Sequence, residues 1–216
     1  MKIIDPSVEL INPPSYATAL NTIEIAGRTC YQSDDKMTDD SAEDFIRRII
    51  ARGHESVLEH VSVTARFICD RGVSHEIVRH RIGAYSQEST RYCNYSGDKF
   101  GNEITVVRPN FLTCDVPAYN GDKEDVWYDT CKSAEYGYFR MMEDGATPQE
   151  ARSVLPNSLK TTLIATYNLR EWRHFLRLRC APDAHPQMQQ VAKMALEQLR
   201  AWGPVFFEDL DPELRG

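Results

Sequence analysis

Residues 61–70 alternate between apolar and mostly polar side chains along their whole length. The apolar positions are Val61, Val63, Ala65, Phe67 and Cys69. Because successive side chains of a strand point to opposite faces, this alternation predicts a half-buried strand in an antiparallel or mixed sheet. A second run, 159–168, is rich in β-branched residues and predicts another strand. Shorter strands are expected within residues 2–12 and at 104–107.

Apolar residues at helical spacing occupy much of the remaining chain. The predicted helices cover residues 16–28, about 42–52, 124–142 and 188–202. Ser41 is expected to cap the second of these helices and Gly53 to end it. Ser74 is expected to cap a short helix that runs to about Ile82.

Helices and strands mix without a regular βαβ alternation, which favours the α+β class. We expect a single domain, residues 1–216, with a central mostly antiparallel sheet flanked by helices. A length of 216 residues fits one domain and is enough to bury a sizeable core. Residues 93–122 contain glycines and prolines and are expected to form a surface excursion.

Positive charge gathers in two stretches of a chain whose net charge is −7. The first stretch joins Arg79-His80-Arg81 to Ser89-Thr90-Arg91. Guanidinium groups bind phosphate in bidentate geometry and stay charged at any working pH. Nucleic-acid-binding domains are usually basic overall, so local clusters on an acidic chain suit a small anionic ligand better. This stretch therefore predicts a site for a phosphorylated small molecule.

The second stretch runs from Asn168 to Arg179, where Arg170, Arg173 and Arg177 share one face of a predicted helix. An amphipathic helix with a charged outer side accounts for Arg173 and Arg177. Arg179 lies off that stripe, at the end of the helix. An arginine in that position can point into a cleft instead of along a surface.

Several common sites are missing from the sequence. It contains no Gly-x-Gly-x-x-Gly fingerprint, no P-loop and no Gly-x-Ser-x-Gly elbow. His75 and His80 are five residues apart, whereas a zinc helix needs histidines four apart, so no metal is predicted. The six scattered cysteines favour reduced thiols in the cytoplasm. Neither a signal peptide nor a membrane span is expected.

The motif Arg79-His80-Arg81, with Ser89 on the eighth residue after it, resembles the signature of the flavin-dependent thymidylate synthases. Further segments agree with this family in the same order along the chain. They are His54–His60, Glu76, Ala151–Pro156, Asn168–Arg170 and Arg179. The resemblance spans most of the chain, from about His54 to Gln190.

This resemblance implies a homotetramer with active sites built at subunit interfaces. It implies the reductive methylation of dUMP to dTMP, with methylenetetrahydrofolate as carbon donor and NADPH as reductant through FAD. No nucleic-acid partner and no membrane partner are expected.

The resemblance also implies which residues bind each molecule. FAD would be held by Ser56, Arg79, His80, Arg81, Gln87, Asn168, Leu169, Arg170 and His174. The substrate dUMP would be held by Glu76, Ile77, Val78, Arg79, Gln87, Glu88, Ser89, Thr90, Arg91, Arg152 and Arg179.

Arg179 is the catalytic candidate. A fixed positive charge beside the uracil would stabilise loss of the ring N3 proton and raise electron density at carbon 5, where the new carbon attaches. Ser89 is expected to bind the nucleotide, because no histidine or lysine base stands at a fixed position beside it in the sequence.

The chain departs from the commonest family pattern in places. Ala84 replaces a serine, Ser86-Gln87 replaces Asn-Glu, and His185 lies farther from Arg179 than in some members. His54 is expected either to border the flavin and folate or to be a structural histidine. Two other functions stay open: a flavin- or nucleotide-binding module without transferase activity, and an RNA-binding or interaction protein. Net acidity counts against the last.

Overall fold

The structure is a computed structural model that describes residues 1–97, 101–114, 117 and 119–210. Its strands are β1 (Lys2–Ile4), β2 (Ser7–Ile11), β3 (Ser62–Asp70), β4 (Ala84–Gln87), β5 (Thr105–Val107) and β6 (Lys160–Asn168). Its α-helices are α1 (Tyr16–Tyr31), α2 (Ser41–Ala51), α3 (Arg71–Ile77), α4 (Lys123–Glu143), α5 (Pro148–Ala151), α6 (Leu169–Arg179) and α7 (Pro186–Trp202). Short 3-10 turns include Glu55–His60, Arg152–Val154 and Pro204–Phe206. Within these described ranges, none of the helices combines the length and the apolar character needed to span a membrane.

The strands form two sheets, and this mixed α/β arrangement confirms the predicted class. One sheet has four strands in the order β2-β3-β6-β4, and the other pairs β1 with β5 in parallel. In β3 and β6 the hydroxyls of Thr64 and Thr166 lie 2.8 Å apart, while the Leu169 amide donates to the Val61 carbonyl. Residue numbers therefore rise along β3 where they fall along β6, so these two strands are antiparallel.

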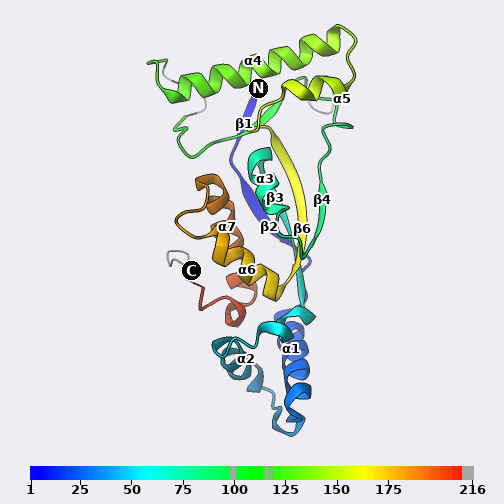
Figure 1. The fold of residues 1–216 in the computed structure, drawn as a ribbon, viewed down its shortest axis with the longest axis vertical. Helices are drawn as coiled ribbons and strands as arrows, with labels where there is room; N and C mark the ends of the chain where they lie inside the picture. The colour runs from blue at the N-terminus through cyan, green and yellow to red at the C-terminus, as the bar shows by residue number, and fades with distance from the viewer. Residues whose placement is uncertain (98–100, 115–116, 118, 211–216) are drawn as a thin grey trace. The chain divides into compact units, whose positions relative to one another are not determined.

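The described residues group into two compact units. The first contains 1–7, 68–77 and the described part of 86–163, and the second contains 8–67, 78–85 and the described residues from 164 onward. In the first unit Ile104, Val106 and Leu159 are fully buried and form a core with Tyr138 of α4. Figure 1 shows α4 running alongside the shorter α5.

In the second unit the predicted alternation of β3 is confirmed. Val63, Ala65 and Phe67 are buried, and the Phe67 ring lies 6.3 Å from Trp172 and 6.2 Å from Phe175, measured between centroids. These contacts hold α6 against β3, and α6 follows directly on β6 and lies beside α7 (Figure 1). The same unit contains α1 and α2, which pack side by side.

Two predicted helix caps are wrong. Ser41 is the first residue of α2, and its hydroxyl donates to Glu24 Oε1 at 2.6 Å. Ser74 lies inside α3, fully buried, and donates to the Arg71 carbonyl at 2.9 Å. Because α3 ends at Ile77, the arginines of the motif that follows are not in a helix. Ser41 is engaged by Glu24, which is 17 residues away in sequence, whereas α3 begins at Arg71, three residues before Ser74.

Arg173 was predicted on an exposed face, and this is wrong, since its side chain is completely buried. Its guanidinium donates to both carboxylate oxygens of Asp209, at 2.7 and 2.6 Å, and to Glu55 at 3.0 Å. The partners come from outside the helix, so the periodicity of α6 could not reveal them. Arg177 is exposed, as predicted.

The ion pair of Arg173 should make stability depend on pH. Burial raises the pKa of Asp209, but the hydrogen bond and charge of Arg173 lower it by more, so it lies below its ordinary 3.8. A lowered carboxyl pKa stabilises the fold above the unfolded value, and this contribution is lost as the pH falls through the folded value.

We therefore expect Asp209→Asn to lower the free energy of unfolding by about 1 kcal/mol at neutral pH, a modest figure because the carboxylate is partly exposed. The difference from the unaltered protein should shrink below pH 3.8. Urea denaturation at several pH values measures it. Asp144→Asn, at an exposed ion pair of α4, is the control. A loss of unfolding free energy of equal size at every pH would contradict this account.

Candidate active site

The junction between β6 and α6 positions the first group of polar residues. Asn168 ends β6, and its side-chain oxygen accepts a hydrogen bond from the Glu171 amide at 2.9 Å, which caps α6. Arg170 and His174 lie within the first two turns and are exposed. Leu169, by contrast, is fully buried, so any ligand contact that it makes must use its backbone.

These residues line a cleft of about 500 Å³ in the second unit. Its lining consists of Glu55, Glu59, Ile82, Asn168, Arg170, Glu171, His174 and Arg177. The sequence predicted three of these as flavin contacts: Asn168, Arg170 and His174. The structure confirms that these three lie together. Whether they bind a flavin stays a prediction.

Carboxylates balance the arginines of the cleft. Arg170 pairs with Glu59, and Arg177 donates to Glu55 at 2.7 Å. Burial raises the pKa of Glu55, but the hydrogen bond from Arg177 and the charge of Arg173 outweigh it, so the pKa lies below its ordinary value. Glu55 is therefore a carboxylate at neutral pH. An anionic ligand that enters this cleft must compete with these carboxylates for the guanidinium groups.

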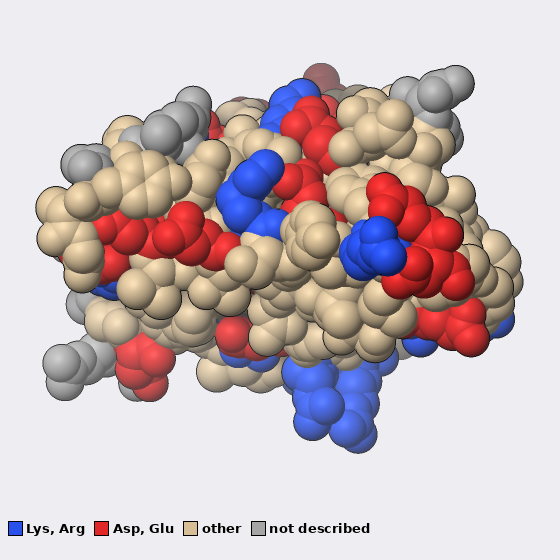
Figure 2. Space-filling model, turned by 90° about the horizontal axis from the view of Figure 1, so that it is seen from above, with Lys and Arg blue, Asp and Glu red and all other residues tan. Residues whose placement is uncertain are grey.

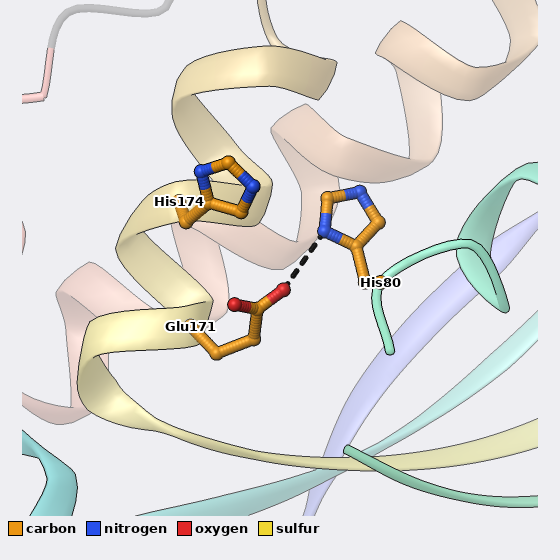
Figure 3. Close-up of side chains that lie close together, drawn as sticks. All are labelled: His80, Glu171 and His174. Carbon is orange, nitrogen blue, oxygen red and sulfur yellow. Dashed lines mark hydrogen bonds and ion pairs between the residues drawn. The ribbon is translucent and has the colours of Figure 1, made fainter. Parts of the chain in front are cut away.

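A hydrogen-bonded chain joins the Arg-His-Arg motif to α6. His80 Nδ1 lies 3.0 Å from Glu171 Oε1, and Arg179 Nε donates to His80 Nε2 at 3.0 Å. Figure 3 shows His80 facing α6 from the opposite segment, with Glu171 and His174 side by side on the helix. His80 and Glu171 are 5% and 6% exposed, so these two members of the chain are shielded from water, whereas Arg179 is partly exposed.

Burial and the neighbouring charges set the protonation of His80. Burial lowers its pKa, the hydrogen bond with Glu171 raises it, and the charge of Arg179 lowers it again, which leaves it below the ordinary value. The imidazole is therefore neutral at neutral pH. Arg179 always donates, so Nε2 of this neutral ring must be the acceptor and Nδ1 carries the proton.

A second hollow of about 360 Å³ lies in the same unit and shares Arg170 and Glu55 with the cleft. His54 and Ser56 line it. His54 Nδ1 lies 2.6 Å from the hydroxyl of Tyr31. The structure therefore places predicted Ser56 beside Arg170, though in a separate hollow from Asn168 and His174.

The loop at 87–91 belongs to the first unit. Gln87 donates to Ser74 at 2.9 Å, and Lys160 pairs with Glu88 at 2.7 Å. The Ser89 hydroxyl accepts from the Arg91 amide at 3.3 Å. That partner is a donor and not a base, so this contact does not activate Ser89 as a nucleophile.

Arg152 is the other predicted nucleotide contact in the first unit. Arg91 Nε donates to Gln149 at 3.1 Å, so the loop touches the turn that leads three residues later to Arg152. Both arginines are exposed, whereas Thr90, next to Arg91 in the sequence, is buried. The loop and the turn thus present two guanidinium groups from segments far apart in sequence.

The predicted site residues divide between the two units. The first holds Glu76, Ile77, Gln87, Glu88, Ser89, Thr90, Arg91 and Arg152. The second holds Ser56, Val78, Arg79, His80, Arg81, Asn168, Leu169, Arg170, His174 and Arg179. Arg79 and Arg81 are exposed on either side of buried His80, whereas Ile77 is fully buried and could reach a ligand only through its backbone.

Five cleft residues were not predicted as ligand contacts. They are Glu55, Glu59, Ile82, Glu171 and Arg177. The spacing of Glu171 and His174, three residues apart on one helix face, is the signal that could have found Glu171. On the face that Figure 2 shows, lysines and arginines occur in several separate groups, and acidic residues lie beside most of these groups.

The cap at Asn168 allows its structural role to be separated from ligand binding. We expect Asn168→Ala to lower the unfolding free energy of the flavin-free protein by about 1 kcal/mol. Asn168→Asp should keep the stability, because aspartate accepts the same Glu171 amide and suits a helix start. Thermal denaturation of both variants measures this, and equal melting temperatures would contradict the capping role.

Comparison with known proteins places this arrangement in a family. The model of the family described as "Thymidylate synthase complementing protein" matches residues 14–205, which include parts of both units. A flavin-dependent thymidylate synthase of Geobacter sulfurreducens is 33% identical over 197 residues, covering 88% of this chain and 81% of that protein. One from Mycobacteroides abscessus is 34% identical over 209 residues, covering 88% and 78%.

A solved structure agrees with these sequence matches. The UMP/dUMP methylase PolB from Streptomyces cacaoi, bound with 5-Br dUMP, superposes with a TM-score of 0.75 and 25% identity, covering 96% of each chain. The family match, the identity to several relatives and the shared fold all extend over most of the residues. This chain therefore belongs to the thymidylate synthase complementing protein family, and its Geobacter and Mycobacteroides relatives are flavin-dependent thymidylate synthases.

Proposed function

We propose that this chain is a flavin-dependent thymidylate synthase that methylates dUMP to dTMP. The observation that carries the proposal is the bond between His80 of the Arg-His-Arg motif and Arg179, 99 residues away in sequence. This bond brings the family motif, the catalytic candidate and the cleft of Asn168, Arg170 and His174 together in one unit. In the overall reaction dUMP gains a carbon from methylenetetrahydrofolate, NADPH is oxidised, and tetrahydrofolate is left.

The residues present fit FAD as the cofactor. Its pyrophosphate needs cations and N–H donors, which Arg170, exposed Arg79 and Arg81, and the start of α6 supply. A cleft of about 500 Å³ in one unit has the size of a small-molecule site. When bound, the flavin would pass reducing equivalents from NADPH to the transferred carbon. The remaining chemistry falls to side chains of this protein.

The fit to dUMP rests on the loop at 87–91 and on Arg152. Arg91 and Arg152 offer two exposed guanidinium groups for the phosphate, while Ser89 offers a hydroxyl for the nucleotide. The Streptomyces methylase was solved with a brominated dUMP, and a shared fold makes the same nucleotide the natural ligand here. Ser89 binds in this scheme and does not attack.

Arg179 has the central chemical role. Its fixed charge lies beside the uracil ring and stabilises the negative charge that develops when the N3 proton is lost. Electron density then rises at carbon 5, which attacks the incoming carbon. A preorganised charge of this kind lowers a barrier by about 3–4 kcal/mol.

The same family similarity leads us to expect a homotetramer that works in the cytoplasm, with each active site shared between subunits. NADPH and methylenetetrahydrofolate are the proposed co-substrates. Sedimentation of the purified protein tests the first expectation, and a monomer with full activity would refute shared sites.

An absorbance spectrum tests the function directly. We expect the purified protein to show flavin bands that shift when dUMP is added, and to form dTMP when NADPH and methylenetetrahydrofolate are present. Arg179→Ala should lower the rate of dTMP formation by about 100-fold or more while FAD stays bound. Arg140→Ala, at an exposed ion pair of α4, is the matched control and should keep its rate. Yellow protein that never forms dTMP would favour a binding module instead.

The phosphate contacts can be tested by titration. Arg91→Ala and Arg152→Ala should each weaken dUMP binding about 10- to 100-fold, because a hydrogen bond to a charged group contributes roughly 1.5–3 kcal/mol. FAD content should stay unchanged, since both residues lie outside the flavin set. Calorimetric titration with dUMP and with deoxyuridine, which lacks the phosphate, distinguishes a phosphate contact from a contact with the rest of the nucleotide. Equal losses for both ligands would exclude a phosphate contact.

A further inference from the structure

Glu171 is the least explained residue of the cleft. It is 6% exposed, and its carboxylate meets the buried imidazole of His80 at 3.0 Å. A buried carboxylate costs free energy unless hydrogen bonds compensate for the lost water. The contacts around Glu171 indicate which interaction its buried carboxylate stabilises.

Donor and acceptor roles in the chain run in one direction. The guanidinium of Arg179 can only donate, so His80 Nε2 accepts and His80 Nδ1–H donates to Glu171. Without an acceptor at Nδ1, the neutral ring could place its proton on Nε2 instead. That tautomer would present a donor to the guanidinium and break the contact.

The imidazole is held in place on its other sides. The ring of Phe175 lies 4.9 Å from that of His80, and Tyr167 lies 6.3 Å away, both measured between centroids. The hydroxyl of Tyr85 donates to the His80 carbonyl and lies 2.9 Å from the hydroxyl of Tyr167. These contacts restrict the ring, and Glu171 provides the acceptor that keeps the proton on Nδ1 while Nε2 faces Arg179.

A metal centre is the competing interpretation of this cluster. His80, Glu171 and His174 offer ligand atoms within 4.8 Å of one another. However, the guanidinium of Arg179 already occupies one nitrogen of His80, and the other nitrogen is engaged by Glu171. A cation at this point would lie beside a permanent positive charge, so hydrogen bonding accounts for the geometry better.

We propose that Glu171 is a positioning residue, which fixes the Nδ1–H tautomer of His80 so that Nε2 holds the guanidinium of Arg179. The contact uses Nε of Arg179 and thereby fixes the orientation of the planar guanidinium. This inference rests on the proposed function, in which Arg179 acts on the uracil ring.

The first test reads the tautomer, independently of activity. In protein labelled with 15N-histidine, solid-state NMR distinguishes protonated from unprotonated ring nitrogens, and His80 is identified by the signals that His80→Gln removes. We expect Nδ1–H in the unaltered protein and in Glu171→Gln, whose amide oxygen can still accept. Glu171→Leu, which keeps the bulk without the acceptor, should change the tautomer. An unchanged tautomer in Glu171→Leu would overturn the proposal.

The second test separates positioning from general stability. Glu171→Leu should lower kcat about 10- to 100-fold while FAD content and the KM for dUMP change little, because only the orientation of Arg179 is lost. Glu171→Gln should restore most of the rate. Glu24→Gln, at another buried ion pair of this unit, is the control and should keep its kcat.

The outcomes are distinguishable from failure of the proposed function. Protein that forms no dTMP but shows the expected tautomer change refutes the function and leaves the chain of contacts intact. A Glu171→Leu variant that loses FAD, dUMP affinity and melting temperature together would show a merely structural role and overturn the proposal. A Glu171→Leu variant whose kcat stays within twofold of the unaltered protein would also overturn the proposal.

Discussion

Trp172 and Phe175 of α6 pack on Phe67 of β3, and this apolar contact determines where the polar side of the helix points. With these aromatic rings buried, Glu171 and His174 lie on the flank of α6 that contacts His80. Burial of large aromatic side chains contributes several kcal/mol, far more than any single polar contact of the cleft. The cleft therefore depends on the core beneath it.

The electrostatics of the second unit follow from this placement. Each arginine of α6 meets a partner: Arg170 pairs with Glu59, Arg173 with Asp209, and Arg177 with Glu55. Arg179 differs, since its Nε donates to a neutral imidazole. This contact with a neutral acceptor orients the guanidinium, and a fixed orientation is what stabilisation of a developing anion requires.

Local patterns predicted the regular elements well. The alternation of 61–70 and the β-branched run at 159–168 became β3 and β6, and the apolar stripes became α2, α4 and α7. Such patterns succeed because burial on one face is written at short range in the sequence. Ser41 and Arg173 were misjudged because their partners, Glu24 and Asp209, depend on how the chain packs. Ser74 was misjudged because α3 begins three residues earlier, at Arg71.

The residues themselves determined the chemistry available to this protein: arginines for an anionic ligand, a motif that resembles a known family, and a chain organised as mixed helices and strands. Only the tertiary structure showed that His80, Glu171 and Arg179 form one chain of hydrogen bonds. The reason is physical, since a hydrogen bond acts over about 3 Å and needs a defined direction, neither of which spacing along a sequence can express. Glu171 was therefore an ordinary helix residue in the sequence and became the acceptor that orients a histidine only after folding.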